Sequence, residues 1–216
     1  INHHNIQELE HIFDFIEREN INRVCFYHLV YSGRGSQMMD EDVTAAESRR
    51  AMDIIIRRTR DFEERGLKKE ILTVDNHCDG VYMYLKALQE GRVELAAQIQ
   101  KYISMNGGNR SGIAFGEVDP MGYVHPDQFT QHHTFGNVRE RSFGDIWTDT
   151  TDPIMRGLKD RKPLLKGRCA RCKFLKNCNG NFRTRAEART GDFWESDPSC
   201  YLTDEEIGLV PEGEKR

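Results

Sequence analysis

The sequence has no long hydrophobic run, no strong excess of one charge and no N-terminal targeting pattern. Without about eighteen consecutive apolar residues, a membrane-spanning helix is not expected. The net charge of −4 offers no basic footprint for a nucleic-acid partner. The first residues, INHHNIQELE, contain neither an initiator Met nor a signal peptide. We therefore expect a fragment of a longer protein without membrane or nucleic-acid partners.

Cysteine is present, but nothing in the sequence points to secretion, where disulfide frameworks usually occur. In a reducing compartment, clustered cysteines are more typical of metal ligands, so we expect a cytoplasmic protein. Two of the cysteines stand apart from the cluster in the sequence, and Cys25 fits a core thiol because its neighbours are apolar. The six are Cys25, Cys78, Cys169, Cys172, Cys178 and Cys200.

The first half of the chain alternates between helical and strand patterns. Residues 6–16 and 43–65 carry apolar residues at helical spacing, and residues 80–106 are also mostly helical. The apolar run 23–31 predicts a strand covered on both faces, and residues 70–75 predict a second strand. Two strands joined by a long helix predict a parallel βαβ unit, which needs further strands to make a stable domain.

The character of the sequence changes near residue 108, so we predict two regions, 1–107 and 108–216. Residues 112–126 predict a β-hairpin, because DPMG suits a type I turn. Ser142 and Asp152, the latter followed by Pro, predict helix starts.

A cysteine cluster with the spacing C-x2-C-x5-C lies in CARCKFLKNC, and 21 residues separate its last cysteine from Cys200. Four thiolates suit either zinc or an iron–sulfur cluster, and the spacing alone leaves both open. The basic neighbours Arg168, Arg171 and Lys173 are expected to favour the thiolate form.

The stretch CARCKFLKNCNGNFRTRAEARTGDFWESDPSC resembles the C-terminal SPASM region of radical S-adenosylmethionine (SAM) enzymes. The resemblance implies that Cys169, Cys172, Cys178 and Cys200 hold one auxiliary 4Fe–4S cluster. Phe182 and Asp127 stand where two ligands of a second auxiliary cluster are expected, which implies that this second cluster is lost.

Four further segments resemble the radical SAM enzymes of haem d1 biosynthesis, the NirJ type: FYHLVYSGRG, TVDNHCDG, LLKGRC and CYLTDEEIG. This resemblance implies an α/β fold, in which the late part of a partial (β/α)6 TIM-like barrel in residues 1–107 precedes a SPASM-type α+β region. It implies an iron tetrapyrrole substrate, 12,18-didecarboxysirohaem, which loses two propionate side chains through a 5′-deoxyadenosyl radical made from SAM. An electron donor such as flavodoxin or ferredoxin is implied as well.

The radical-forming motif of that family, C-x3-C-x2-C, is absent from the sequence. The chain is therefore expected to represent the late barrel onward, and to be inactive alone.

Candidate site residues follow the two predicted strands, because active-site groups of such barrels lie at the carboxyl ends of the strands. Arg34 can clamp a carboxylate of SAM or substrate, with Ser32 beside it. Asp75 and His77 are candidate catalytic residues, where His77 binds the substrate iron or delivers a proton. Asn76 between them is a candidate for binding SAM or substrate.

Other interpretations remain open at this stage. A different SPASM enzyme, such as a coprohaem decarboxylase or a peptide maturase, fits the cysteines, and so does a non-enzymatic zinc module. His28 is predicted to be a hydrogen-bonded core residue, and His132 and His133 are assigned no role.

Overall fold

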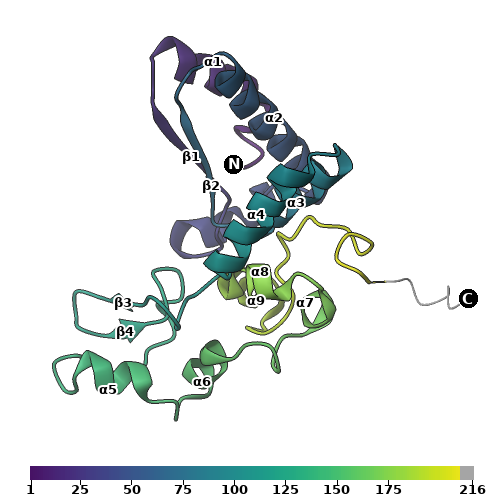
Figure 1. The fold of residues 1–216 in the computed structure, drawn as a ribbon. Helices are drawn as coiled ribbons and strands as arrows, with labels where there is room; N and C mark the ends of the chain where they lie inside the picture. The colour runs from purple at the N-terminus through teal and green to yellow at the C-terminus, as the bar shows by residue number, and fades with distance from the viewer. Residues whose placement is uncertain (210–216) are drawn as a thin grey trace, which may run out of the picture.

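The structure, a computed structural model, describes residues 1–209. A two-stranded sheet and helices form one region, and a hairpin with short helices forms the other (Figure 1). The first region contains η1 (Ile6–Glu8), α1 (Leu9–Arg18), β1 (Arg23–Tyr27), η2 (Gly33–Glu41), α2 (Ala45–Glu64), β2 (Glu70–Val74), α3 (Cys78–Gln89) and α4 (Val93–Asn106). The second contains β3 (Glu117–Val118), β4 (Val124–His125), α5 (Phe143–Thr148), α6 (Pro153–Lys159), α7 (Gly167–Arg171), α8 (Leu175–Cys178) and α9 (Arg183–Thr190).

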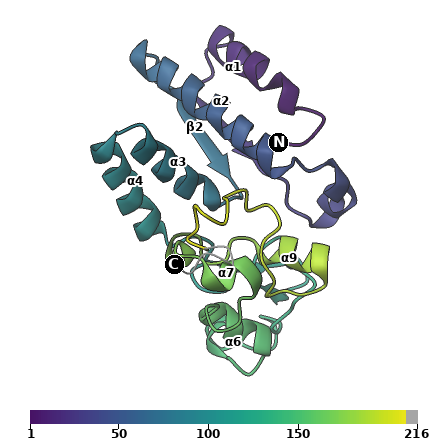
Figure 2. The ribbon, with the colours of Figure 1, turned by 90° about the vertical axis from the view of Figure 1, so that its right-hand side faces the viewer.

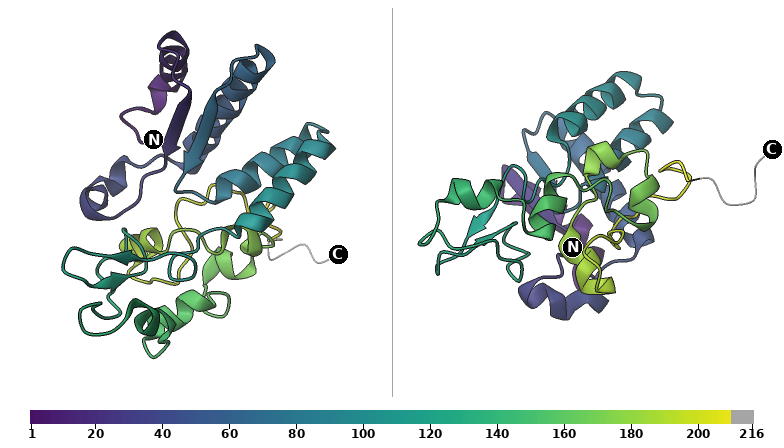
Figure 3. Two further views of the ribbon diagram at one scale, coloured as in Figure 1. Left: turned by 60° about the vertical axis from the view of Figure 1, so that its left-hand side comes forward. Right: turned by 90° about the horizontal axis from the view of Figure 1, so that it is seen from below.

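Strands β1 and β2 are parallel and in register from Arg23 opposite Glu70 to Tyr27 opposite Val74. Helix α2 connects them, and the two strands lie side by side (Figure 3). The predicted βαβ unit is thereby confirmed. The first strand is shorter than its apolar run, which continues to residue 31 as irregular chain.

The expectation that this strand is covered on both faces is wrong for the described residues. Tyr27 is 55% exposed, and Cys25 is half-buried where a core thiol was expected. The physical reason is that the described sheet has only two strands, so helices of this chain cannot enclose both of its faces.

Local sequence signals position the long helices against the sheet. Helix α2 begins with a capping box, in which the Thr44 hydroxyl accepts a hydrogen bond from the Glu47 backbone at 3.2 Å. Helix α1 buries Leu9, Phe13 and Ile16 on one face. The Phe13 ring lies 5.2 Å from that of Phe26 on β1, which fixes the helix over the strand.

The second region follows its predicted turn and caps. Strands β3 and β4 are antiparallel, and the Gly122 N–H donates to the Asp119 carbonyl at 2.9 Å across the turn. The Ser142 hydroxyl caps α5, and the Asp152 carboxylate caps α6 with Pro153 in its first turn. The predicted hairpin and helix starts are confirmed.

One hydrophobic core spans the two regions. Phe174, Tyr201, Leu202 and Ile207 from the second region pack with residues of α1, α2 and α3. Figure 2 shows the last described segment running between these helices and α7 (Figure 2). A division at residue 107/108 stays a prediction. In the described part of the chain, no helix is long and apolar enough to cross a bilayer.

Candidate metal centre and adjoining cleft

Five of the six cysteines line a single cavity between α3 and the second region: Cys78, Cys169, Cys172, Cys178 and Cys200. The structure thus brings together the four cysteines of the predicted ligand set. Cys78 stands apart from them in the sequence, 91 residues before Cys169, but not in space, because α3 begins at the cavity wall.

Short helices and turns aim the four clustered sulfurs at the cavity. Cys169 lies in α7, Cys172 follows this helix, Cys178 ends α8, and Cys200 lies in the last irregular segment. Gly108, at the end of α4, allows α8 to approach. A Cβ at this position would lie 2.2 Å from the Cys178 carbonyl carbon.

The Phe174 N–H donates a hydrogen bond to Cys172 Sγ at 3.4 Å. The backbone N–H groups of Asp197, Gly180 and Leu202 act to lower the pKa of Cys169, Cys178 and Cys200, respectively. Such hydrogen bonds favour thiolate ligands and tune the potentials of iron–sulfur clusters. The donor set and its N–H partners therefore fit a thiolate-bound cluster.

Burial opposes ionisation of these thiols more strongly than the basic neighbours favour it. Burial raises the pKa of Cys169, Cys172 and Cys178 above the ordinary thiol value. Arg168 lowers the pKa of Cys172 and Cys200, as expected of a basic neighbour, but burial outweighs it at Cys172. For Arg171 and Lys173 the expectation stays a prediction. Among these four, only the pKa of Cys200 is lowered, chiefly by the neighbouring Cys78 thiol.

Asn76 connects the second strand end to the cysteine cavity. Its amide Nδ2 donates to the Ser199 carbonyl at 2.9 Å, and its Oδ1 accepts from the Cys78 thiol at 3.0 Å. The Asn181 amide also donates to this oxygen at 2.7 Å. Asn76 is thus engaged inside the protein, and its binding of SAM or substrate stays a prediction.

The two positions where ligands of a second cluster are expected are filled by other interactions. The Asp127 carboxylate is buried and accepts hydrogen bonds from the Ser111 hydroxyl and from Thr130. Phe182 is 7% exposed, and its ring stacks on that of His77 with a centroid distance of 5.8 Å. These residues complete a packed core, which agrees with a single auxiliary cluster.

Asp75 and His77 line a cleft of about 520 Å³ at the end of β2. The cleft also contacts Phe182, Arg110 and the exposed ring of Phe115. Burial lowers the pKa of His77 to about 4, so its imidazole is neutral at pH 7 and suits an iron ligand better than an acid. Burial raises the pKa of Asp75.

The candidates after β1 lie in different surroundings. Ser32 lines a neighbouring hollow together with Asp75, and its hydroxyl donates to the Phe129 carbonyl at 2.7 Å. Arg34 is exposed in η2 and does not line the cleft at the end of β2. Its role as a clamp stays a prediction. His28 is the expected core residue, because its Nε2 lies 2.9 Å from the buried Asp79 carboxylate.

Sequence reasoning missed three charged residues of this region. Arg110 is the cation at the cleft. Arg185 and Asp197 form a fully buried ion pair, in which Arg185 also donates to the carbonyls of Leu29 and Asp75. Charged side chains are rarely buried, so the sequence gives little signal for such a pair.

Comparisons with known proteins show which families the chain is similar to. The family described as SPASM, an iron–sulfur cluster-binding domain, matches residues 115–173. A Fe-coproporphyrin III synthase of Methanosarcina barkeri is 57% identical over 96% of this chain and 53% of its own length. A pre-heme d1 synthase of Dinoroseobacter shibae is 38% identical over 97% of this chain and 52% of its own length. The chain thus spans about half the length of the curated relatives it matches.

The fold is similar to that of a solved structure described as native anSMEcpe with bound AdoMet. The TM-score is 0.60 at 12% sequence identity, and the match covers 96% of this chain and 52% of the other. The predicted fold class is confirmed, with late βα units of a radical SAM barrel ahead of a SPASM-type region. Residues 115–173 thus match an iron–sulfur cluster-binding domain, and nearly the whole chain is similar to about half of each of these synthases.

Proposed function

We propose that this chain is the late barrel and auxiliary-cluster part of a radical SAM enzyme that forms Fe-coproporphyrin III. The observation that carries the proposal is the 57% identity to a Fe-coproporphyrin III synthase across nearly the whole chain. A second candidate is the haem d1 reaction, in which 12,18-didecarboxysirohaem loses two propionates. The 38% identity to a pre-heme d1 synthase supports it less strongly.

In this proposal, Cys169, Cys172, Cys178 and Cys200 are the ligands of one 4Fe–4S cluster. Their common cavity and the backbone N–H groups that favour their thiolate forms support this assignment. When bound, such a cluster supplies one-electron redox chemistry. The alternative, a zinc module, predicts a different metal content. Anaerobically reconstituted protein would then hold zinc and almost no iron or sulfide.

The cleft at the end of β2 is proposed as the tetrapyrrole site. The exposed ring of Phe115 offers aromatic surface for a macrocycle, and Arg110 offers a cation for its carboxylates. The neutral His77 imidazole is a suitable ligand for the substrate iron, while Asp75 is a candidate proton acceptor. Ser32 and Arg34 are proposed to contact SAM or substrate from η2, and Asn76 from the neighbouring strand end.

The experiment is a product assay on the full-length protein with its clusters loaded, a reductant and SAM. Mass spectrometry should detect Fe-coproporphyrin III, whereas formation of pre-haem d1 would favour the second candidate. The His77→Ala variant should lose tetrapyrrole conversion while its iron and sulfide content stays unchanged. The exposed control His11→Ala should keep both the conversion and the iron and sulfide content. A loaded protein that neither converts nor binds iron tetrapyrroles would reject the proposal.

The electron donor and location belong to the same proposal. A flavodoxin or ferredoxin is the expected donor, and the cytoplasm is the expected compartment because free thiols and a reducible cluster require reducing conditions. Reduction of the loaded protein by purified flavodoxin, followed by spectroscopy, tests the donor directly.

A further inference from the structure

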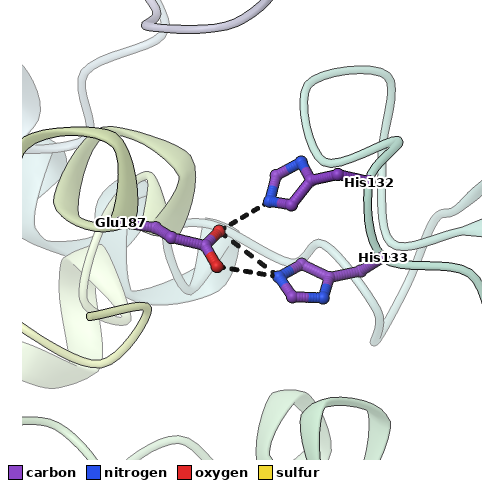
Figure 4. Close-up of side chains that lie close together, drawn as sticks. All are labelled: His132, His133 and Glu187. Carbon is purple, nitrogen blue, oxygen red and sulfur yellow. Dashed lines mark hydrogen bonds and ion pairs between the residues drawn. The ribbon is translucent and has the colours of Figure 1, made fainter. Parts of the chain in front are cut away.

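Two histidines and a glutamate converge on one point away from the cysteine cavity. His132 and His133 lie in the loop after β4, and Glu187 lies in α9. Figure 4 shows both imidazole rings pointing toward the Glu187 carboxylate (Figure 4). The Nε2 atoms of His132 and His133 lie 2.7 Å and 3.1 Å from its oxygens. One ligand atom from each residue lies within 4.8 Å of the other two.

The arrangement is held in place by its surroundings. The His133 ring packs edge-on against Phe193 at a centroid distance of 5.1 Å. The backbone carbonyl of His133 lies 2.9 Å from the Nδ1 atom of His125. His133 and Glu187 are largely buried, with 23% and 24% of their side chains exposed, and His132 is 53% exposed. Two neighbouring imidazoles aimed at one carboxylate are thus fixed before any ligand arrives.

The separations match those between ligands of a metal ion. Zinc binds imidazole nitrogen and carboxylate oxygen at about 2.0–2.2 Å, so two ligands of a tetrahedral ion lie roughly 3.3 Å apart. The contacts between the imidazole nitrogens and the carboxylate, 2.7–3.3 Å, are close to this value, and the ligand atoms of the two histidines lie within 4.8 Å of each other. We propose that His132, His133 and Glu187 bind one divalent transition-metal ion, at a site distinct from the cysteines.

The proposed metal site is open on one side, and an ion bound there links two segments of the chain. His132 and Glu187 line a hollow of about 250 Å³ that Ser32 also lines, so a fourth ligand can reach the ion from there. Ser32 also donates to the carbonyl of Phe129, in the same loop as the histidines. A bound ion therefore ties this loop to α9 beside the end of β1.

Zinc binding to the full-length protein tests the site, after anaerobic reconstitution has filled the cysteines. Zinc is added, excess is removed, and zinc, iron and sulfide are measured together. Wild-type protein should retain about one additional zinc. His132→Gln, His133→Gln and Glu187→Gln should each weaken zinc binding at least about tenfold, with unchanged iron and sulfide.

The matched control is His11→Gln, because His11 forms an exposed pair with Glu8 at 2.9 Å without a second histidine. It should leave zinc binding unchanged. Cobalt substitution should give d–d bands without thiolate charge-transfer bands. Equal zinc uptake by wild-type and Glu187→Gln protein, or a cobalt spectrum with thiolate bands, would overturn the assignment whether or not the proposed function holds.

Discussion

The guanidinium of Arg185 and the carboxylate of Asp197 pair at 2.8 Å with no exposed surface on either side chain. Asp197 also accepts from the Phe182 backbone at 3.0 Å, and Arg185 donates to the Asp75 carbonyl at 2.8 Å. The pair therefore joins the cysteine-rich region to the strand end that carries the candidate catalytic residues.

Removing one partner of this pair should strongly destabilise the protein. Arg185→Ala leaves the Asp197 charge buried and unpaired, so the free energy of unfolding should fall by about 3–5 kcal/mol. Chemical denaturation measures the change. Arg189→Ala is the control on the same helix, because Arg189 forms an exposed pair with Asp40, and it should cost less than about 1 kcal/mol. Similar losses in the two variants would contradict the prediction.

The cysteines should divide into ligands and non-ligands. Cys178→Ala and Cys200→Ala should lower the iron and sulfide content and destabilise the second region, because each removes a thiolate from the cavity. Cys25→Ala should do neither, since Cys25 lies on β1 away from the cavity. Iron and sulfide assays after anaerobic reconstitution, together with thermal unfolding, check both statements.

Cys78 should act as a reserve ligand beside Cys200. Because both cysteines line the same cavity, Cys200→Ala should retain more iron than the double variant Cys78→Ala/Cys200→Ala. Cys78→Ala alone should keep the full iron content. Equal iron content in the Cys200→Ala single variant and in the double variant would show that Cys78 cannot replace the missing ligand.

His77 should make stability depend on pH. Its pKa is about 4 in the folded protein against an ordinary value of 6.5, so the unfolded chain binds more protons between these values. Stability should therefore be complete above pH 6.5 and fall as the pH drops toward 4, by about 2 kcal/mol between pH 7 and pH 5. His77→Phe should remove this part of the pH dependence. Denaturation curves at the two pH values measure it, and an unchanged slope would contradict burial as the cause.

Arg110 should contribute to tetrapyrrole affinity. Arg110→Ala removes the cation at the cleft, so binding of Fe-coproporphyrin III should weaken by about 1.5–3 kcal/mol, measured from the shift of the porphyrin absorption band. Arg34→Ala tests the clamp predicted after β1 in parallel, with SAM affinity measured as well. Arg139→Ala, in the segment after the hairpin, is the control and should change neither affinity.

The sequence predicts the local features well, because their signals lie within a few residues. The apolar runs identify β1 and β2, DPMG identifies the hairpin turn, and Ser142 and Asp152 identify helix starts. The family resemblance adds the four-cysteine set, whose shared cavity the structure provides.

Features that depend on distant contacts were not predictable. Cys78 reaches the cavity because α3 starts against α8, and no spacing rule connects residue 78 with residue 200. An arginine in a polar helix such as α9 is usually expected to face solvent. Arg185 is instead fully buried and donates to backbone carbonyls. His132 and His133 gain a partner only when the loop folds onto α9.

Cys200 is followed directly by Tyr201 and Leu202, which are buried in the core of the first region. The Tyr201 hydroxyl donates to the Asp79 carboxylate at 2.6 Å, and the same carboxylate pairs with His28. Ligand binding at Cys200 therefore favours the docked form of this segment, and metal binding stabilises the folded state by mass action. Removal of iron should therefore raise protease susceptibility in α1, α2 and α3 as well as around the cysteines, because Tyr201 and Leu202 pack against these helices.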